Sequence, residues 1–135
     1  MSQAGTYEET LQCGGKLKVT KSSWLIEYYF SGPDLRYNGD FVRVQGSQVP
    51  NYITAYKENW EKYCELKKTI PKGGEFSTSG KLGMQIRLGG FHDGVCIQSY
   101  HMPLNNINSI NKVIESYKYA LKRAPEIRKL LSSLQ

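Results

Sequence analysis

Two changes of hydrophobic period, each beside a proline, constrain the fold of this chain more than any other feature. Before Pro50 and again before Pro103, polar and apolar residues alternate, which is typical of half-buried β-strands. After each proline the apolar residues recur with the period of an amphipathic helix, as at Ile53, Tyr56 and Trp60. This order predicts an α+β fold, in which antiparallel β-sheet is covered by two amphipathic helices.

Turn residues divide the chain into the expected elements. The sequence of residues 24–30, rich in β-branched and aromatic residues, gives the clearest strand. Residues 6–12 fit either a strand or a loose arm. Pro71 ends the first helix, and Pro125 interrupts the second, so that a short C-terminal helix is expected over residues 125–135. The other expected strands cover residues 16–20, 41–44, 84–88 and 95–100, and the two long helices begin at Pro50 and Pro103.

The two halves of the chain follow one plan. The tripeptide Gly-Lys-Leu occurs at residues 15–17 and again at residues 80–82, and each half continues with strands, a proline and a helix. Because amphipathic helices share their period by construction, the order of the elements carries more weight than the residue identities. We expect one domain over residues 1–135, and an internal duplication of residues 14–70 and 80–124 is one explanation of the pattern.

The charge of the chain is distributed unevenly along the sequence. Of the net charge of +6, residues 1–66 contribute −1 and residues 67–135 contribute +7. Such an excess of Lys and Arg suits a nucleic acid, a nucleotide or an acidic protein surface, although a solvated basic helix would give the same count. No apolar run approaches the ~20 residues of a membrane-spanning helix. The first residues have no signal-peptide or transit-peptide character, so we expect a cytoplasmic protein.

The cysteines and histidines do not have the spacing of a metal or redox site. Cys13, Cys64 and Cys96 are odd in number and far apart, which fits neither a disulfide framework nor a zinc site. His92 and His101 have no second ligand at metal-binding spacing and belong to no recognisable Ser/His/acid arrangement. We therefore expect neither a metal nor a cofactor.

The phosphate-loop and carboxylate patterns of an enzyme are also incomplete. Residues 74–82 resemble a phosphate-binding loop, but the spacer is one residue too long and Leu82 stands where Ser or Thr is needed. Lys81 remains available to a phosphate. Glu58 and Glu61 alternate with lysines on the first helix, in contrast to the isolated, apolar setting of a tuned acid/base pair. These patterns argue against catalysis, and we expect a protein that is not an enzyme.

Basic and aromatic residues on the expected strands are the remaining candidates for a binding site. Alternation along residues 24–30 places Tyr28 on one strand face and Tyr29 on the other. One face must pack on a helix, whereas the other can offer rings for base stacking beside cations that contact phosphates. The candidate phosphate-binding residues are Lys16, Lys18, Lys21, Arg36, Arg43, Lys81 and Arg87. The candidate stacking residues are Trp24, Tyr29, Tyr37 and Phe91; of these, Trp24 fits a core position better, and Tyr29 and Tyr37 fit either.

The order of strands and helix, with a proline before each helix, resembles that of the Whirly proteins. These are relatives in fold of the positive-cofactor transcriptional coactivators and of the Pur-alpha repeat proteins. The most similar passage covers residues 95–124, and residues 41–68 resemble its first copy. The lysine-rich signature of plant Whirly proteins is absent. The resemblance implies that a homo-oligomer binds single-stranded nucleic acid across its sheets, without catalysis.

We therefore expect non-enzymatic binding of a phosphate-rich ligand, above all single-stranded DNA or RNA. One alternative is a phage-type anti-defence protein that sequesters a nucleotide or cyclic-nucleotide signal in a pocket between protomers. Another is a protein-interaction module that docks on an acidic partner through residues 112–129. The basic residues of the C-terminal region, which suit oligomerisation or long-range attraction, are Lys118, Lys122, Arg123, Arg128 and Lys129.

Overall fold

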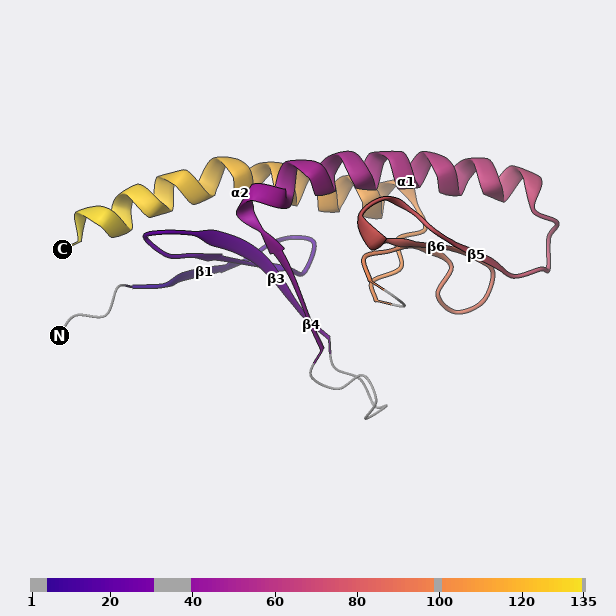
Figure 1. Cartoon of the computed structure of the whole chain (residues 1–135), viewed down its shortest axis with the longest axis horizontal. Coiled ribbons are helices and arrows are strands. Elements are labelled where there is room, and N and C mark those ends of the chain that lie inside the picture. Colours follow the sequence, from indigo (N-terminus) through magenta and orange to yellow (C-terminus); the bar gives the residue numbers. More distant parts are fainter. Residues whose placement is uncertain (1–4, 31–39, 99–100, 135) are drawn as a thin grey trace. The chain divides into compact units, whose positions relative to one another are not determined.

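The computed structural model describes residues 5–30, 40–98 and 101–134, and it confirms the predicted α+β class. The fold has a four-stranded and a three-stranded antiparallel sheet and two long helices (Figure 1). The strands are β1 (Tyr7–Thr10), β2 (Lys16–Val19), β3 (Trp24–Phe30), β4 (Asp40–Gln45), β5 (Phe76–Ser79), β6 (Gln85–Leu88) and β7 (Gly94–Cys96). The helices are α1 (Val49–Thr69) and α2 (Ile107–Ser133), with short 3-10 turns η2 (Gly46–Gln48) and η3 (Lys81–Gly83).

The chain divides into two compact units. The first unit comprises residues 1–50 and 115–135, and the second comprises residues 51–114. The sheet β1-β2-β3-β4 therefore belongs to the first unit together with most of α2, and the sheet β5-β6-β7 belongs to the second together with nearly all of α1. These units cut across the two residue ranges predicted as repeats, because each sheet packs on a helix from the other half of the chain.

In the first unit, one face of the sheet is apolar and packs against α2 (Figure 1). Alternation sends Leu17, Ile26 and Val44 to this face, where cross-strand pairing aligns them and all three are buried. The hydroxyls of Tyr28 and Tyr117 lie 3.0 Å apart and join β3 to the helix. Burial of each such aliphatic side chain stabilises the fold by roughly 1.5–3 kcal/mol. The opposite face of the same sheet is left free to carry polar and exposed aromatic residues.

In the second unit, α1 packs against the three-stranded sheet through a polar and an apolar contact. Asn59 is buried, and its side-chain amide both donates to the carbonyl of Lys81 and accepts the Lys81 N–H, at 3.2 and 2.8 Å. Gly80 is needed beside it, because a Cβ there would lie 2.5 Å from the Asn59 Oδ1. Tyr56 and Ile86 lie in the buried apolar core of this unit. The loop predicted to resemble a phosphate-binding loop is thus tied to α1.

The structure corrects several of the predicted boundaries. The predicted break at Pro125 is wrong, since α2 continues through it from Ile107 to Ser133 and buries Ala124 and Ile127 on either side. This burial offsets the hydrogen bond that a proline removes from a helix. The second helix starts at Ile107, after Pro103, because Leu104 exchanges backbone hydrogen bonds with Val95 at 2.9 and 3.0 Å.

The structure also differs from expectation at residues 74–82, which resemble a phosphate-binding loop in sequence. Within this segment β5 pairs with β6, and only the residues around it form turns. The strand predicted over residues 95–100 ends at Cys96, and residues 99–100 lie outside the described chain. The N-terminal segment forms the strand β1. No helix within the described residues is both long and apolar enough to cross a membrane.

Candidate nucleic-acid interface

The open face of the sheet β1-β2-β3-β4 gathers several of the predicted binding residues. Strand register places Glu27 between Lys16 on β2 and Arg43 on β4, and it places Tyr29 opposite Phe41. Directly opposed residues in an antiparallel sheet point to the same side. The resulting groove has a volume of about 690 Å³, and it is lined by Gly14, Lys16, Lys18, Glu27, Tyr29 and Phe41. We call this surface, together with Arg43, the open face.

Two exposed aromatic rings lie side by side on the open face. Tyr29 is 55% exposed and Phe41 is 47% exposed, and their ring centroids are 4.8 Å apart with planes inclined at 49°. The sequence predicted Tyr29 but missed Phe41. The missed signal was alternation along β4, because buried Val42 and Val44 leave Phe41 and Arg43 on the other side. Exposed rings of this size offer flat apolar area to a planar ligand.

A carboxylate stands in the middle of the cations on this face. Glu27 accepts from the Lys18 Nζ at 2.7 Å and from the Arg43 Nε at 2.6 Å, and only 9% of the residue is exposed. The hydrogen bond from Lys18, followed by that from Arg43, holds the pKa of Glu27 below its ordinary value. The same bond raises the pKa of Lys18. Glu27 is therefore ionised and Lys18 is charged at neutral pH.

The remaining contacts on the open face link cations to rings and to a second carboxylate. The Arg43 guanidinium carbon lies 4.8 Å from the centroid of the Phe41 ring, which is a cation–π distance. The Lys16 Nζ lies 3.8 Å from a carboxylate oxygen of Glu8, and both side chains are about half exposed. Lys16, Lys18 and Arg43 thus face two carboxylates. A phosphate would meet a weakly positive surface, on which the two rings are about half exposed.

The other predicted residues are distributed elsewhere. Trp24 is half-buried on the helix-facing side, and its indole covers Gly46 so closely that a Cβ there would lie 2.5 Å from the ring. Lys21 is half-buried, and its carbonyl accepts from the Arg128 Nε at 3.2 Å. Arg36 and Tyr37 lie outside the described residues. Lys81, Arg87 and Phe91 belong to the second unit, where Lys81 is exposed in η3.

In the second unit, Arg87 and Phe91 lie around a pocket of about 190 Å³ next to the turn between β6 and β7. Phe91 is fully exposed, at 100%. The turn that carries it is braced by Asp93, which accepts from the Gly89 N–H at 2.6 Å and from the hydroxyl of Tyr63. Burial and this contact with Asp93 raise the pKa of Tyr63 well above its ordinary range. One ring, that of Phe91, therefore stands on a firmly held turn, and one cation, Arg87, lies on the adjoining strand β6.

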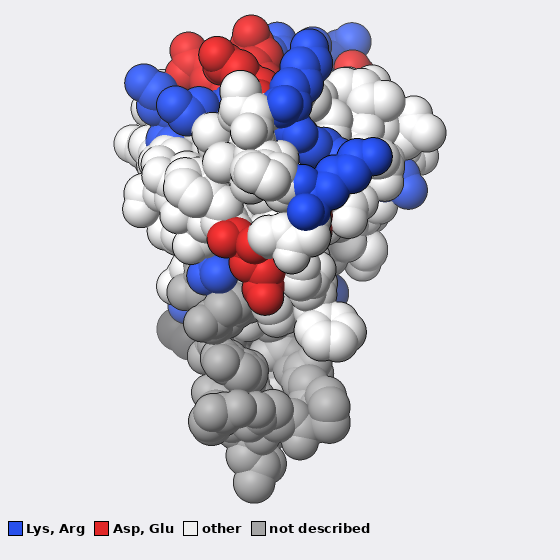
Figure 2. Space-filling view, turned by 90° about the vertical axis from the view of Figure 1, so that its right-hand side faces the viewer, with Lys and Arg blue, Asp and Glu red and all other residues white. Residues whose placement is uncertain are grey.

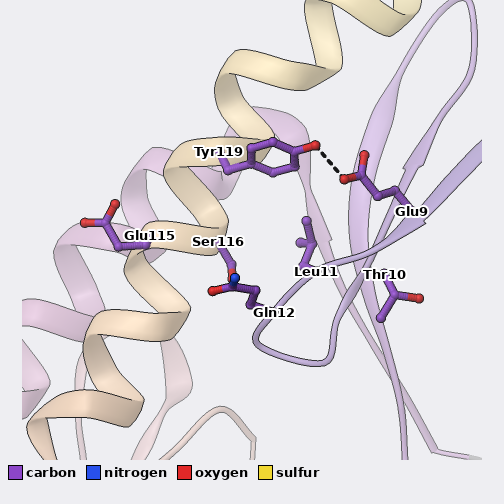
Figure 3. A pocket seen from close by; sticks show the side chains of 7 residues that line it. All are labelled: Glu9, Thr10, Leu11, Gln12, Glu115, Ser116 and Tyr119. Atoms are coloured by element: carbon purple, nitrogen blue, oxygen red, sulfur yellow. Dashed lines mark hydrogen bonds between the residues drawn. The ribbon is translucent and has the colours of Figure 1, made fainter.

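A third hollow lies in the first unit between the end of β1 and α2, with a volume of about 360 Å³ (Figure 3). Its lining includes the carboxylates Glu9 and Glu115. Glu9 accepts hydrogen bonds from the hydroxyls of Tyr119 and Tyr7. Burial raises the pKa of Glu9, but the hydrogen bonds from Tyr119 and Tyr7 outweigh it and the pKa lies below the ordinary value. Two carboxylates make this pocket unsuitable for a phosphate.

The fold also redistributes the charge that the sequence placed in its second half. The first unit has ten Lys and Arg against seven Asp and Glu, and the second has eight against five, so each carries a net +3. On the face shown in Figure 2, cationic and acidic side chains lie next to one another. Within the first unit, α2 carries three exposed lysines, Lys118, Lys122 and Lys129. Neither unit depends on the other for its basic character.

Two findings concern metal-ligating and thiol groups in the described part of the chain. No group of three or more His, Cys, Asp or Glu residues there could hold a metal ion. Burial raises the pKa of the Cys96 thiol to about 11, which keeps it protonated at neutral pH. No family model, curated protein or solved structure matches this chain. The resemblance to the Whirly proteins therefore stays a prediction.

Proposed function

We propose that this protein binds single-stranded nucleic acid, DNA or RNA, on the open face, and that it does so without catalysis. The observation that carries this proposal is the exposed Tyr29–Phe41 pair, which lies on the same sheet face as Lys16, Lys18 and Arg43. Binding of a single strand requires aromatic rings on which bases can stack and cations that contact the phosphates, and this exposed sheet face carries both. We expect the complex to form in the cytoplasm, in keeping with three free cysteines.

The ring pair favours unpaired bases over a duplex. A base can stack on Tyr29 or Phe41 only if its π-face is free, and in a duplex both faces are covered by neighbouring base pairs. Each stacked base contributes roughly 1–3 kcal/mol. If one or two bases stack on these rings, a single strand should bind with about tenfold to a hundredfold or more higher affinity than a duplex of the same sequence.

The cations of the open face are expected to contribute less to the binding affinity than their number suggests. Lys18 and Arg43 are already held by Glu27, and a phosphate that takes either of them must approach this carboxylate. Among the described residues, Lys16 is paired only with the exposed Glu8, so it is the cation most easily transferred to a phosphate. For single strands the logarithm of affinity falls with the logarithm of salt by about 0.7 per phosphate contacted. For this protein we expect the logarithm of affinity to change with the logarithm of salt concentration with a slope of about −1 to −2. This slope is shallower than that of a protein whose binding is dominated by phosphate contacts.

A titration of the purified protein tests this proposal. Fluorescence anisotropy is measured with a labelled single strand of about 30 nucleotides and its duplex, at about 50 and 200 mM salt. We expect the single strand to bind more tightly than the duplex. Tyr29→Ala should weaken binding, whereas Phe91→Ala, which removes an exposed ring from the other unit, should not. The absence of binding to the single strand at low salt would contradict the proposal.

The same titration separates the two alternatives. A pocket for a nucleotide signal would bind a mononucleotide or cyclic dinucleotide as tightly as the strand. Docking on an acidic protein through α2 would instead depend on Lys118, Lys122 and Lys129 and would be indifferent to Tyr29. Either outcome would replace the open face as the functional surface.

A further inference from the structure

Glu27 is an unusual residue for a surface that binds nucleic acid, because its charge repels phosphate. It lies on the groove itself, two residues before Tyr29 on β3 and on the same side of the sheet. Two residues of a strand span about 7 Å, which is within reach of a base stacked on the neighbouring ring. Glu27 lies on the same side of the sheet as the exposed rings, and its partner Arg43 contacts the Phe41 ring, so a base stacked on these rings would lie near both groups.

The carboxylate of Glu27 is fixed in place and keeps unused hydrogen-bonding capacity. Lys18 engages one oxygen and Arg43 the other, so the group is oriented from both sides. An ionised carboxylate has about four acceptor positions, and these two contacts occupy two of them. Because it is ionised, it can accept hydrogen bonds but cannot donate them. The groove therefore selects for a base edge that presents N–H donors.

Guanine is the base whose edge matches such an acceptor. Its Watson–Crick edge presents two adjacent donors, the N1–H and the 2-amino group, which can meet the two oxygens of one carboxylate. Adenine and cytosine each present one amino group beside an acceptor nitrogen, and thymine or uracil presents a single N–H between two carbonyl oxygens. In these three bases an acceptor atom would face the carboxylate and be repelled by it.

We propose, as an extension of the proposed function, that Glu27 recognises an unpaired guanine stacked on the Tyr29–Phe41 pair. In this arrangement Lys18 and Arg43 position the carboxylate, and Lys16 at the groove contacts the adjoining phosphate. Glu27 is then a specificity residue, and the open face reads a base edge as well as stacking on bases. If Glu27 were only the centre of a structural ion-pair network, its replacement would change stability and leave base preference unaltered.

The test compares strands that differ in one base. Labelled oligo(dT) strands of about 12 nucleotides carry a single central guanosine, inosine or 1-methylguanosine, and their affinities are measured by anisotropy. Inosine lacks only the 2-amino group, and 1-methylguanosine lacks the N1–H donor. Hydrogen bonds to charged groups are worth about 1.5–3 kcal/mol, so we expect guanosine to bind about tenfold or more tightly than either analogue.

Glu27→Gln provides the matched change in the protein. It keeps the shape of the side chain and should bring the guanosine-to-inosine ratio down to about threefold or less. Glu8→Gln is the control, since it removes another carboxylate from the same sheet face and should leave the ratio unchanged. Circular dichroism checks that both variants fold. If Glu27→Gln does not fold, the two analogues with the unaltered protein still decide whether guanine is recognised through its N1–H and 2-amino donors, and Glu27→Asp, which keeps the charge but shortens the side chain, tests the assignment to Glu27.

The outcomes distinguish this inference from the proposed function. If no strand binds, the proposed function itself fails. If all strands bind equally to the unaltered protein, the proposed function stands and guanine recognition is overturned. If guanosine is preferred but Glu27→Gln retains the full preference, the assignment to Glu27 is overturned.

Discussion

The open face in the first unit and the β6–β7 turn in the second unit carry the same kinds of side chain in different settings. On the open face, Tyr29 and Phe41 are held by the register of two strands, 4.8 Å apart. On the turn, Phe91 is fully exposed, and its ring contacts no other ring among the described residues. A sheet supplies several ligand-facing residues at fixed spacing, whereas a turn supplies one. This difference is why we assign nucleic-acid binding to the first unit.

The largest expected effect comes from removing the ring pair. The double variant Tyr29→Ala/Phe41→Ala should weaken binding of a single strand by about 2–4 kcal/mol, or roughly thirtyfold to a thousandfold. Phe91→Ala should change affinity by less than about twofold. Both are measured by anisotropy at one salt concentration. If the Phe91 variant lost more affinity than the double variant, the comparison between the two regions would be reversed.

A second variant weakens the turn and leaves the open face intact. Asp93→Asn disturbs the hydrogen bonds from Gly89 and Tyr63 that hold the turn. Hydrogen bonds to charged groups contribute about 1.5–3 kcal/mol each, so we expect a loss of about 1–3 kcal/mol in the free energy of unfolding. Urea denaturation measures this loss, and anisotropy should show unaltered strand affinity. A parallel loss of affinity in folded protein would show that the turn takes part in binding.

The two regions should also differ in their response to pH. Glu27 has a lowered pKa in the fold, so its contribution to stability is present above the unfolded value of about 4.3 and is lost as pH falls through the folded value. Tyr63 has a raised pKa, so its contribution is present below the unfolded value of about 10 and is lost as pH rises beyond it. Glu27→Gln should flatten the acid side of a melting-temperature profile.

Tyr63→Phe should flatten the alkaline side of that profile and leave the acid side unaltered. Thermal melts of both variants and the unaltered protein, from about pH 3 to about pH 11, provide the measurement. If each variant changed both limbs equally, the two groups would not act independently in their units.

The smallest effect concerns salt. Arg43→Gln should make the salt dependence of strand binding shallower by at most about 0.7, and by less if Glu27 retains this cation in the complex. Arg87→Gln, the matching change in the second unit, should leave the slope unaltered. Titrations at four salt concentrations between about 50 and 300 mM give both slopes. A change of slope with Arg87→Gln alone would move the phosphate contacts to the second unit.

Alternation in the sequence predicted the fold class and much of the open face. It placed Tyr29 opposite to Tyr28 along β3, and the structure shows the same division, with Tyr28 buried and Tyr29 exposed. The same rule, applied to β4, would have identified Phe41. The ion pairs of Glu27 with Lys18 and Arg43 could not be predicted, because they depend on the register between three strands.

The sequence also could not predict which helix packs on which sheet. Helical periodicity shows that α1 and α2 each have an apolar side, but not which sheet covers it. Pro125 was treated as a break because a proline removes one hydrogen bond, whereas burial of Ala124 and Ile127 around it decides the outcome. Long-range packing outweighed the local signal in both cases.

The central claim, that a single strand stacks on Tyr29 and Phe41, is tested most directly by photo-crosslinking. A strand containing 5-iodouracil is irradiated with the protein, and tryptic peptides are identified by mass spectrometry. We predict crosslinks in the peptides of residues 22–36 and 37–43, located at Tyr29 and Phe41. Crosslinks confined to the peptide of residues 88–112, which contains Phe91, would contradict the account.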